Sequence, residues 1–417
     1  MTLKNFDQLL QKYAELLVRA GINVQDGQTV VLNIDVDQAE LARLITQEAY
    51  KQGAAHVIVK WSDDYVSRQT MQHAPEEILT DIPQYKIDES IDLIEKEASR
   101  LSVRSSDPEV YAGLDNEKIA AIQKATGKAF IKQREATQAN KVSWTVASAA
   151  GESWAAKVFP DLDSKEEQVD ALWDAIFQSV HLYEDDPVSY WQEKDQRLEA
   201  LADQLNNYSF DALHYTAPGT DLTVGLPKNH LWGGAGSHNA NGHRFIANMP
   251  TEEVFGAPDA NRVDGTVVST KPLSYAGVTI ENMEFTFEDG KVVALTAEKG
   301  QDVIQQLVDT DEGSKHLGEV ALVPDSSPIS QSGLTFYNTL FDENASNHLA
   351  LGSAYAFSLE GGVDMSREEL AEAGLNRSQV HVDFMIGSDQ MDIDGIKADG
   401  SRVPIFRDGE WSKDLLK

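Results

Sequence analysis

Apolar and polar positions in the first 200 residues alternate between strand-like runs and helix-like periods. QTVVLNI at 28–34 is typical of a buried strand, DQAELARLITQEAYKQG at 37–53 has the spacing of an amphipathic helix, and HVIVKW at 56–61 is the next strand. A strand–helix–strand order of this length indicates parallel strands joined by a right-handed crossover. Residues 1–200 are therefore predicted to form an N-terminal open α/β sheet domain, closed by the helices SKEEQVDALWDAIFQSVHL and SYWQEKDQRLEALADQLNN.

The pattern changes after residue 206, where short alternating runs are separated by Gly, Pro and Asp-Gly turns. One helix, GQDVIQQLVDTDEG, interrupts these strands. DQMDIDGIKADGS resembles a calcium-binding loop, but it lacks the first carboxylate and the bidentate glutamate, so a hairpin is the better interpretation. We predict that residues 201–417 form a mainly antiparallel α+β domain. The strand-like runs are ALHYTAPGTDLTVGLP, GTVVSTKPL, MEFTFEDGKVVALTA and HVDFMIGSDQMDIDG.

Composition narrows the chemistry. The 35 basic and 68 acidic residues give a net charge of −33, which repels nucleic acid and anionic membrane surfaces. Cysteine is absent, so disulfides, thiolate zinc sites and cysteine nucleophiles are excluded, and any metal site must use His, Asp and Glu. The N-terminus reads as an amphipathic helix rather than a signal peptide, and no apolar run approaches the roughly 20 residues of a membrane span. We expect a cytoplasmic protein.

Several common motifs are missing. The turn after the first strand, NIDVDQAE, has no glycine-rich phosphate loop, and the chain contains neither HExxH nor GxSxG. GGAGSHNANG at 233–242 is only a partial glycine motif, and it is predicted to be a flexible loop. The first domain therefore offers little recognisable chemistry.

The strand SQVHVDFMIGSD, which begins at Ser378, has an unusual distribution of polarity. Val380 and the alternate residues after it are apolar, whereas His381 and Asp383 point together to the other face. A solvated strand face is the common explanation of such a pair. The alternative is that the imidazole and the carboxylate bind one metal ion or two adjacent ions.

Polar residues also lie within three other segments that are otherwise mostly apolar or composed of small residues. In HLGEVALVP, Glu319 enters an apolar strand, where a carboxylate is costly unless it is paired, coordinated or still in water. In NTLFDENASNHLALGSAYAFS, a helix is predicted to start near Asp342, and it would place His348 and Tyr355 on one face. A core histidine beside a packing tyrosine is the structural alternative. NMPTEEVFGAP carries adjacent glutamates, of which only one can face a given site if the backbone is extended.

Taken together, these segments resemble the M29 family of metallo-aminopeptidases. The matching motifs are APGTDLTVGLP, NMPTEEVFGAP, DEGSKHLGEVALVP, FYNTLFDENASNHLALGSAY and NRSQVHVDFMIGS, in the order and spacing of the family. The resemblance covers essentially the whole chain and is strongest from about residue 210 onward. It implies a two-domain homodimer with an enclosed active-site cavity.

The resemblance also implies a catalytic centre for removing the N-terminal residue of short peptides. The implied catalytic tyrosine is Tyr355, and Glu253 is preferred to Glu252 by its place in the family motif. Two divalent ions fit this set if one carboxylate bridges them, and Zn²⁺ or Co²⁺ is favoured over Mn²⁺ or Mg²⁺, although ligand type alone does not separate them. The implied metal ligands are Glu253, Glu319, His348, His381 and Asp383.

The expected reaction is attack of an ion-activated water on the first peptide carbonyl, with Tyr355 as a hydrogen-bond donor to the oxyanion. Either Glu253 or Glu319 would carry the proton to the leaving amine. One alternative is a non-catalytic acidic protein that binds a metal or a basic peptide. Another is a glycosidase with two catalytic acids, which would need no histidine ligands.

Overall fold

The computed structural model describes residues 3–105, 107–276 and 278–415, and the chain divides into two compact units. Unit 1 comprises the chain up to Glu193 together with Gly236–Met249, and unit 2 comprises Lys194–Ala235 and Pro250–Lys417. The sequence placed the domain boundary at residue 200, whereas the division falls at 193 and a later segment returns to unit 1. This return is formed by strands that a single linear boundary does not capture.

Unit 1 is built on a five-stranded parallel sheet with the order β2-β1-β3-β4-β9. Val30, Val31 and Leu32 are fully buried in the first strand, as expected for a sheet with helices on its faces. The open α/β architecture predicted for this region is confirmed. The strands are β1 (Thr29–Asp35), β2 (His56–Ser62), β3 (Ser99–Arg104), β4 (Trp144–Ser148) and β9 (Asn248–Met249).

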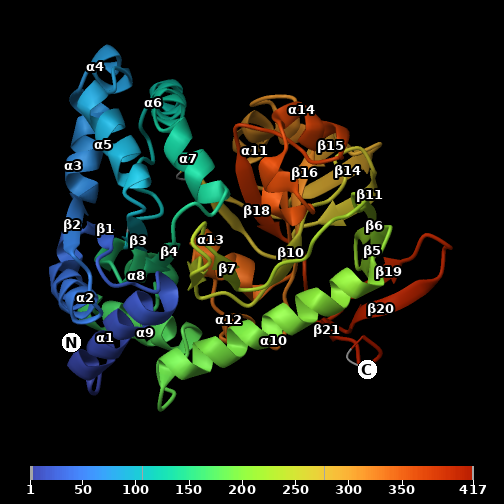
Figure 1. Cartoon of the computed structure of the whole chain (residues 1–417). Coiled ribbons are helices and arrows are strands. Elements are labelled where there is room, and N and C mark those ends of the chain that lie inside the picture. Colours follow the sequence, from blue (N-terminus) through green and yellow to red (C-terminus); the bar gives the residue numbers. More distant parts are fainter. Residues whose placement is uncertain (1–2, 106, 277, 416–417) are drawn as a thin grey trace. The chain divides into compact units, whose positions relative to one another are not determined.

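The helices of this part of the chain run from blue to green in Figure 1. The last of them continues across the division between the units. The helices are α1 (Phe6–Leu16), α2 (Ala39–Lys51), α3 (Asp64–His73), α4 (Glu76–Thr80), α5 (Gln84–Glu95), α6 (Asn116–Ala129), α7 (Ile131–Gln138), α8 (Glu152–Val158), α9 (Lys165–Ser179) and α10 (Pro187–Tyr208).

The prediction of a flexible loop at 233–242 was wrong. Part of this segment forms a short antiparallel hairpin of β7 (Gly236–His238) and β8 (Arg244–Ile246). The Asn239 carboxamide closes the turn, because its oxygen accepts hydrogen bonds from the backbone N–H groups of Asn241 and His243, both at 3.0 Å. A side chain that bonds to its own turn in this way fixes a backbone that glycine content alone suggested to be loose.

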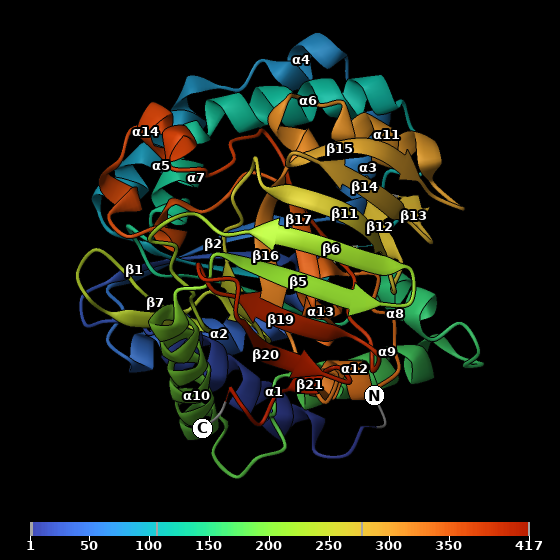
Figure 2. The ribbon, with the colours of Figure 1, turned by 90° about the vertical axis from the view of Figure 1, so that its right-hand side faces the viewer.

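Unit 2 contains an eight-stranded antiparallel sheet with the order β15-β14-β11-β6-β5-β19-β20-β21. Figure 2 shows β6, β5, β19 and β20 side by side, and the pairing of β19 with β20 confirms the hairpin predicted at 389–401. One face of the sheet packs on a large core that includes Phe285, Phe287 and Phe384. Its strands are β5 (Ala212–Ala217), β6 (Thr220–Gly225), β11 (Val263–Val268), β14 (Glu284–Glu288), β15 (Lys291–Thr296), β19 (Asp392–Ile396), β20 (Arg402–Arg407) and β21 (Glu410–Trp411).

A second, four-stranded antiparallel sheet of unit 2 has the order β10-β16-β17-β18. Every residue of β16 and β17 is buried, which agrees with the apolar run predicted at 316–324. The remaining helices of unit 2 include α11, as predicted, and no helix among the described residues is long and apolar enough to cross a membrane. The strands of this sheet are β10 (Val254–Gly256), β16 (Leu317–Leu322), β17 (His348–Gly352) and β18 (His381–Met385). A separate two-stranded sheet comprises β12 (Leu273–Tyr275) and β13 (Val278–Ile280). The helices are α11 (Gln301–Val308), α12 (Pro328–Gln331), α13 (Thr339–Asp342) and α14 (Arg367–Glu372).

The prediction of one helix carrying both His348 and Tyr355 was wrong. Helix α13 is a single turn, a 3₁₀ turn at Glu343–Ala345 follows it, and His348 then opens strand β17. After His348 the segment LALG is apolar on both faces, and the backbone groups of the strand pair with β16 on one side and β18 on the other. So short an apolar run does not distinguish a buried strand from a helix by its pattern, so the tertiary pairing decides.

Candidate metal centre

One face of the four-stranded sheet gathers the polar residues that the sequence singled out. On β18, His381 and Asp383 lie opposite Gly352 and Ala350 of β17, and Asp383 alternates with core-facing neighbours as the pattern predicted. On β17, His348 lies opposite Ala321 of β16. Because residues directly opposite in an antiparallel pair share a face, these side chains project to the same side. We refer to this side as the ligand face.

A β-bulge brings Glu319 onto the ligand face. Leu317 pairs with Leu351, but Glu319 pairs with Ala350, so the register shifts by one residue at Gly318. Without the shift, Glu319 would lie opposite Leu349 on the core side of the sheet. Gly318 permits the bulge, because a Cβ atom there would lie 2.2 Å from the carbonyl oxygen of Gly352.

The ligands are separated by small residues. Ala321, Ala350 and Gly352 occupy the ligand face between the carboxylates and imidazoles. Small side chains at these positions leave the space over the sheet to the longer polar groups and to whatever binds between them. This alternation of large polar and small apolar residues is typical of the surface of a binding site rather than of a packed core.

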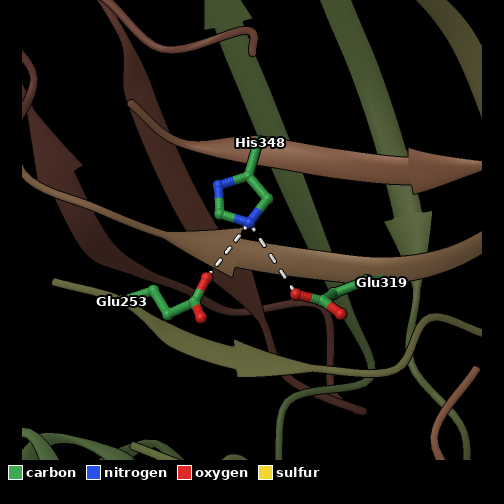
Figure 3. Close-up of side chains that lie close together, drawn as sticks. All are labelled: Glu253, Glu319 and His348. Atoms are coloured by element: carbon green, nitrogen blue, oxygen red, sulfur yellow. Dashed lines mark ion pairs between the residues drawn. The ribbon is translucent and has the colours of Figure 1, made fainter. Parts of the chain in front are cut away.

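The first group comprises Glu253, Glu319 and His348 (Figure 3). The imidazole of His348 points between the two carboxylates, with Nε2 3.1 Å from Glu253 Oε2 and 3.7 Å from Glu319 Oε1. Glu253 lies one residue before β10, whereas the other two lie on β16 and β17. All three residues are buried.

The second group comprises Glu319, His381 and Asp383. His381 Nε2 lies 3.3 Å from Glu319 Oε2 and 3.5 Å from Asp383 Oδ1. Glu319 thus belongs to both groups and presents one oxygen to each imidazole. In each group the candidate ligand atoms lie within 4.8 Å of one another.

Hydrogen bonds on the far side of each imidazole fix its orientation. His348 Nδ1 lies 3.1 Å from the carbonyl oxygen of Ser346, and His381 Nδ1 lies 2.7 Å from that of Ser353. A carbonyl can only accept, so each Nδ1 carries the proton, and in the neutral ring each Nε2 presents a lone pair to the carboxylates. Histidines that bind metals commonly donate their other N–H to a backbone carbonyl in this way.

The cluster is electrostatically incomplete without a cation. Among the described residues, Glu253 Oε2 and Asp383 Oδ1 are buried and have no hydrogen-bond partner, and the contact of Glu253 with His348 is close but lacks hydrogen-bond geometry. Carboxylate oxygens that face imidazole lone pairs repel them unless a proton or a metal ion lies between. The oxygen and nitrogen donor set fits divalent ions such as Zn²⁺ and Co²⁺.

The pKa shifts of the cluster also show that its buried carboxylates stabilise a positive charge beside them. Burial lowers the pKa of His348, but Glu253 and Glu319 raise it by more than burial lowers it. The net pKa of His348 is therefore well above its ordinary value. Burial raises the pKa of the Glu319 carboxyl, but hydrogen bonds with His348 and His381 outweigh burial and lower this pKa to about 2. By contrast, burial dominates for Glu253 and raises its pKa. The two glutamates therefore differ in their readiness to take up a proton.

Tyr355 lies beside this cluster. Its ring centroid is 5.0 Å from that of His381 and 5.1 Å from that of Phe357, against which it stacks. His381 lowers the pKa of Tyr355, but burial and the negative charges of Glu319 and Asp383 outweigh it, and the pKa is about 12. The phenol therefore stays protonated near neutral pH and remains a hydrogen-bond donor.

The sequence analysis missed Glu343, which the structure places in the same electrostatic environment. Burial, together with the charges of Asp383 and Glu253, raises the pKa of Glu343 well above its ordinary value. The residue is buried in the 3₁₀ turn before β17. In the sequence, Glu343 looks like one of the polar residues at a helix start. Only the position of its 3₁₀ turn beside the ligand face identifies it as a residue near the site.

Comparison with known proteins agrees with the geometry. A sequence model of a family described as thermophilic metalloprotease (M29) matches residues 6–411. The chain is 61% identical to aminopeptidase PepS of Streptococcus thermophilus over 99% of this chain and 100% of that protein, and 54% identical to aminopeptidase AmpS of Bacillus subtilis (strain 168) over 98% and 99%. The solved structure of wild-type AmpT from Thermus thermophilus matches with a TM-score of 0.91 and 41% identity, covering 97% of this chain and 99% of that one.

Proposed function

The chain belongs to the thermophilic metalloprotease (M29) family and is a metal-dependent aminopeptidase, and we propose that the ligand face of the four-stranded sheet is its catalytic centre. The observation that carries this proposal is that a buried oxygen of Glu253 and one of Asp383 have no hydrogen-bond partner and face the Nε2 atoms of His348 and His381 at 3.1 and 3.5 Å. The comparisons give no support to a non-catalytic acidic binding protein.

We propose two divalent ions, Zn²⁺ or Co²⁺ in the first instance. Glu253, Glu319 and His348 would hold one, and Glu319, His381 and Asp383 would hold the other. The membership of Glu319 in both groups supports a bridging role for its carboxylate. When bound, such ions supply Lewis-acid polarisation of a carbonyl and a low-pKa water.

The protein's own groups complete the proposed reaction. The protonated Tyr355 hydroxyl would donate a hydrogen bond to the oxyanion that forms from the scissile carbonyl, an interaction that strengthens as charge develops. Either Glu253 or Glu319 would carry the proton to the leaving amine. The carboxylates around the site would attract the positively charged N-terminus of a peptide.

Short peptides are the proposed substrates. The test is release of the first residue from one short peptide with a free or an acetylated N-terminus, before and after chelation and metal add-back. We expect chelator-sensitive, metal-restored release from the free peptide only. Release from the acetylated peptide would contradict the exopeptidase assignment, and chelator-insensitive release would contradict the metal centre.

We also propose a cytoplasmic homodimer. Several large apolar side chains on and near α3, α4 and α5 of unit 1 are exposed, which is unusual for a surface that meets only water. Burial of these side chains against a second copy would account for their exposure, and sedimentation analysis of a variant with charged residues at these positions would test it. The exposed residues are Trp61, Tyr65, Val66, Ile78 and Tyr85.

A further inference from the structure

Glu253 differs from its partner ligands in how its backbone is held. Glu319, His348, His381 and Asp383 lie on paired strands, whereas Glu253 precedes β10, whose ladder begins at Val254. Strand hydrogen bonds therefore do not fix the residue that carries this carboxylate. Something else must hold the loop at Glu252 and Glu253 against the ligand face.

The adjacent residue supplies such an attachment. The Glu252 carboxylate forms a buried ion pair with Lys194 of α10, and the exposed fractions of the two residues are only 8% and 6%. The backbone N–H of Glu252 donates to Asn344 Oδ1 at 2.6 Å, and the Asn344 amide in turn donates to the Leu340 carbonyl at 2.9 Å. Asn344 is fully buried beside Glu343. We call Lys194, Glu252 and Asn344 the brace.

We propose that the brace positions Glu253 for metal binding, so that Lys194 and Glu252 set metal affinity without contacting the metal. The Glu252 side chain reaches Lys194 and the adjacent Glu253 side chain reaches His348, so fixing the first restricts the directions open to the second. Lys194 also neutralises a carboxylate that would otherwise add repulsion to the buried acids of the site. This inference rests on the proposed function, because it assumes that Glu253 is a ligand.

The test is titration of the metal-stripped, full-length protein with Co²⁺ alone, whose visible absorption reports its coordination. Glu252→Gln and Lys194→Met should each weaken Co²⁺ affinity by roughly 10- to 100-fold, the usual cost of losing a partner that orients a metal ligand. At saturating Co²⁺ we expect kcat to recover, because the residues of the cluster are intact.

Glu48→Gln is the matched control. Glu48 is a glutamate of unit 1 that is 1% exposed and is paired with Lys51 at 3.0 Å, so this variant also neutralises a buried, lysine-paired carboxylate. It should lower thermal stability while leaving Co²⁺ affinity unchanged. If Glu252→Gln behaves in the same way, with Co²⁺ affinity within about 2-fold of wild type, the brace has only a structural role and the proposal is overturned.

A further variant covers the case in which a single change prevents folding. Lys194→Met/Glu252→Gln leaves no uncompensated charge, so it should fold, and it is expected to show the same weakened Co²⁺ binding. Wild-type affinity in this double variant would also overturn the proposal. Glu253→Gln separates the two levels of inference: weakened binding in Glu253→Gln but not in the brace variants refutes only the brace, whereas unchanged binding in Glu253→Gln refutes the ligand assignment and the brace together.

Discussion

Each of the two units gathers acidic residues at the edge or face of a sheet, and each includes a buried carboxylate, but the buried carboxylates are satisfied differently. In unit 1, Asp35 ends β1 beside a cavity of about 290 Å³ that is also lined by Asp37, Asp63 and Asp107. Its carboxylate accepts hydrogen bonds from the Ser62 hydroxyl and from the N–H and hydroxyl of Ser105, the latter two at 2.9 Å. On the ligand face of unit 2, Glu253 and Asp383 each keep a buried oxygen without such a donor.

This difference teaches that the number of carboxylates does not identify a metal site. The cavity of unit 1 has more acidic lining residues than the ligand face, yet the groups with metal-binding geometry among the described residues are the two on the ligand face. Donors already supply what the Asp35 carboxylate needs. Where such donors are missing and imidazole Nε2 atoms face the buried oxygens, a proton or a metal ion is required between them.

The largest expected effect comes from removing an imidazole of the second group. His381→Ala should lose metal content and aminopeptidase activity together, with metal affinity falling by more than the roughly 100-fold seen when only an outer partner is lost. Metal analysis after gel filtration and peptide turnover measure both quantities. If the variant kept its metal and its activity, His381 would not be a ligand.

Removing the phenolic hydroxyl should separate chemistry from binding. Tyr355→Phe is expected to retain its metal and to lose about 10²–10³-fold in kcat, the effect of deleting one donor to an oxyanion. Metal content and steady-state kinetics on the same preparation give the result. Unchanged turnover would remove Tyr355 from the mechanism and leave it as a packing partner of His381 and Phe357.

A third prediction asks whether hydrogen-bond donors are always enough to keep a buried aspartate ionised, and it concerns Asp342. It accepts from the N–H groups of Phe336 and Asn338, yet burial outweighs these bonds and raises its pKa from 3.8 to about 7. A raised pKa favours the protonated native form, so its stability contribution is present below pH 4 and is lost as the pH rises to about 7.

The expected loss for Asp342 is on the order of 2–4 kcal/mol, at about 1.4 kcal/mol for each unit of pKa shift. Asp342→Asn should flatten this part of the pH dependence, which urea unfolding of the metal-stripped protein between pH 4 and 7 would measure. An equal slope in variant and wild type would show that Asp342 is ionised throughout.

The smallest effect on function is expected in unit 1, where Asp35→Asn replaces one accepting oxygen by an NH₂ group that cannot accept from the Ser62 or Ser105 donors. We expect a loss of about 1–3 kcal/mol in unfolding free energy, with metal content and turnover unchanged. Asp383→Asn is the counterpart on the ligand face and should instead release metal. Metal loss in Asp35→Asn, or metal retention in Asp383→Asn, would invalidate the distinction between satisfied and unsatisfied acids.

The sequence allowed prediction of the elements whose periodicity is unambiguous. The alternation at 378–389 placed His381 and Asp383 on one face, and the apolar run around Glu319 predicted a buried strand, both as found. The resemblance supplied the grouping of Glu253, Glu319, His348, His381 and Asp383, because no local pattern shows that residues so far apart in the chain meet.

Other features depend on tertiary contacts that leave little trace in a local pattern. The apolar segment at His348 fits a helix or a strand until its neighbours on β16 and β18 are known. Glu343 is near the cluster only because a 3₁₀ turn precedes β17, and Glu252 is distinguished from Glu253 by a lysine 58 residues earlier in the chain. Neither relation has a spacing that could be read from one sequence.

The bulge at Gly318 limits how this protein can vary during evolution. A one-residue slip of β16 past β17 would place Glu319 opposite Leu349 on the core side and send a leucine or valine to the ligand face. A change in length within β16, β17 or β18 is therefore far more damaging than many exchanges of side chains. We expect homologous enzymes to place their insertions and deletions in the connections outside these strands.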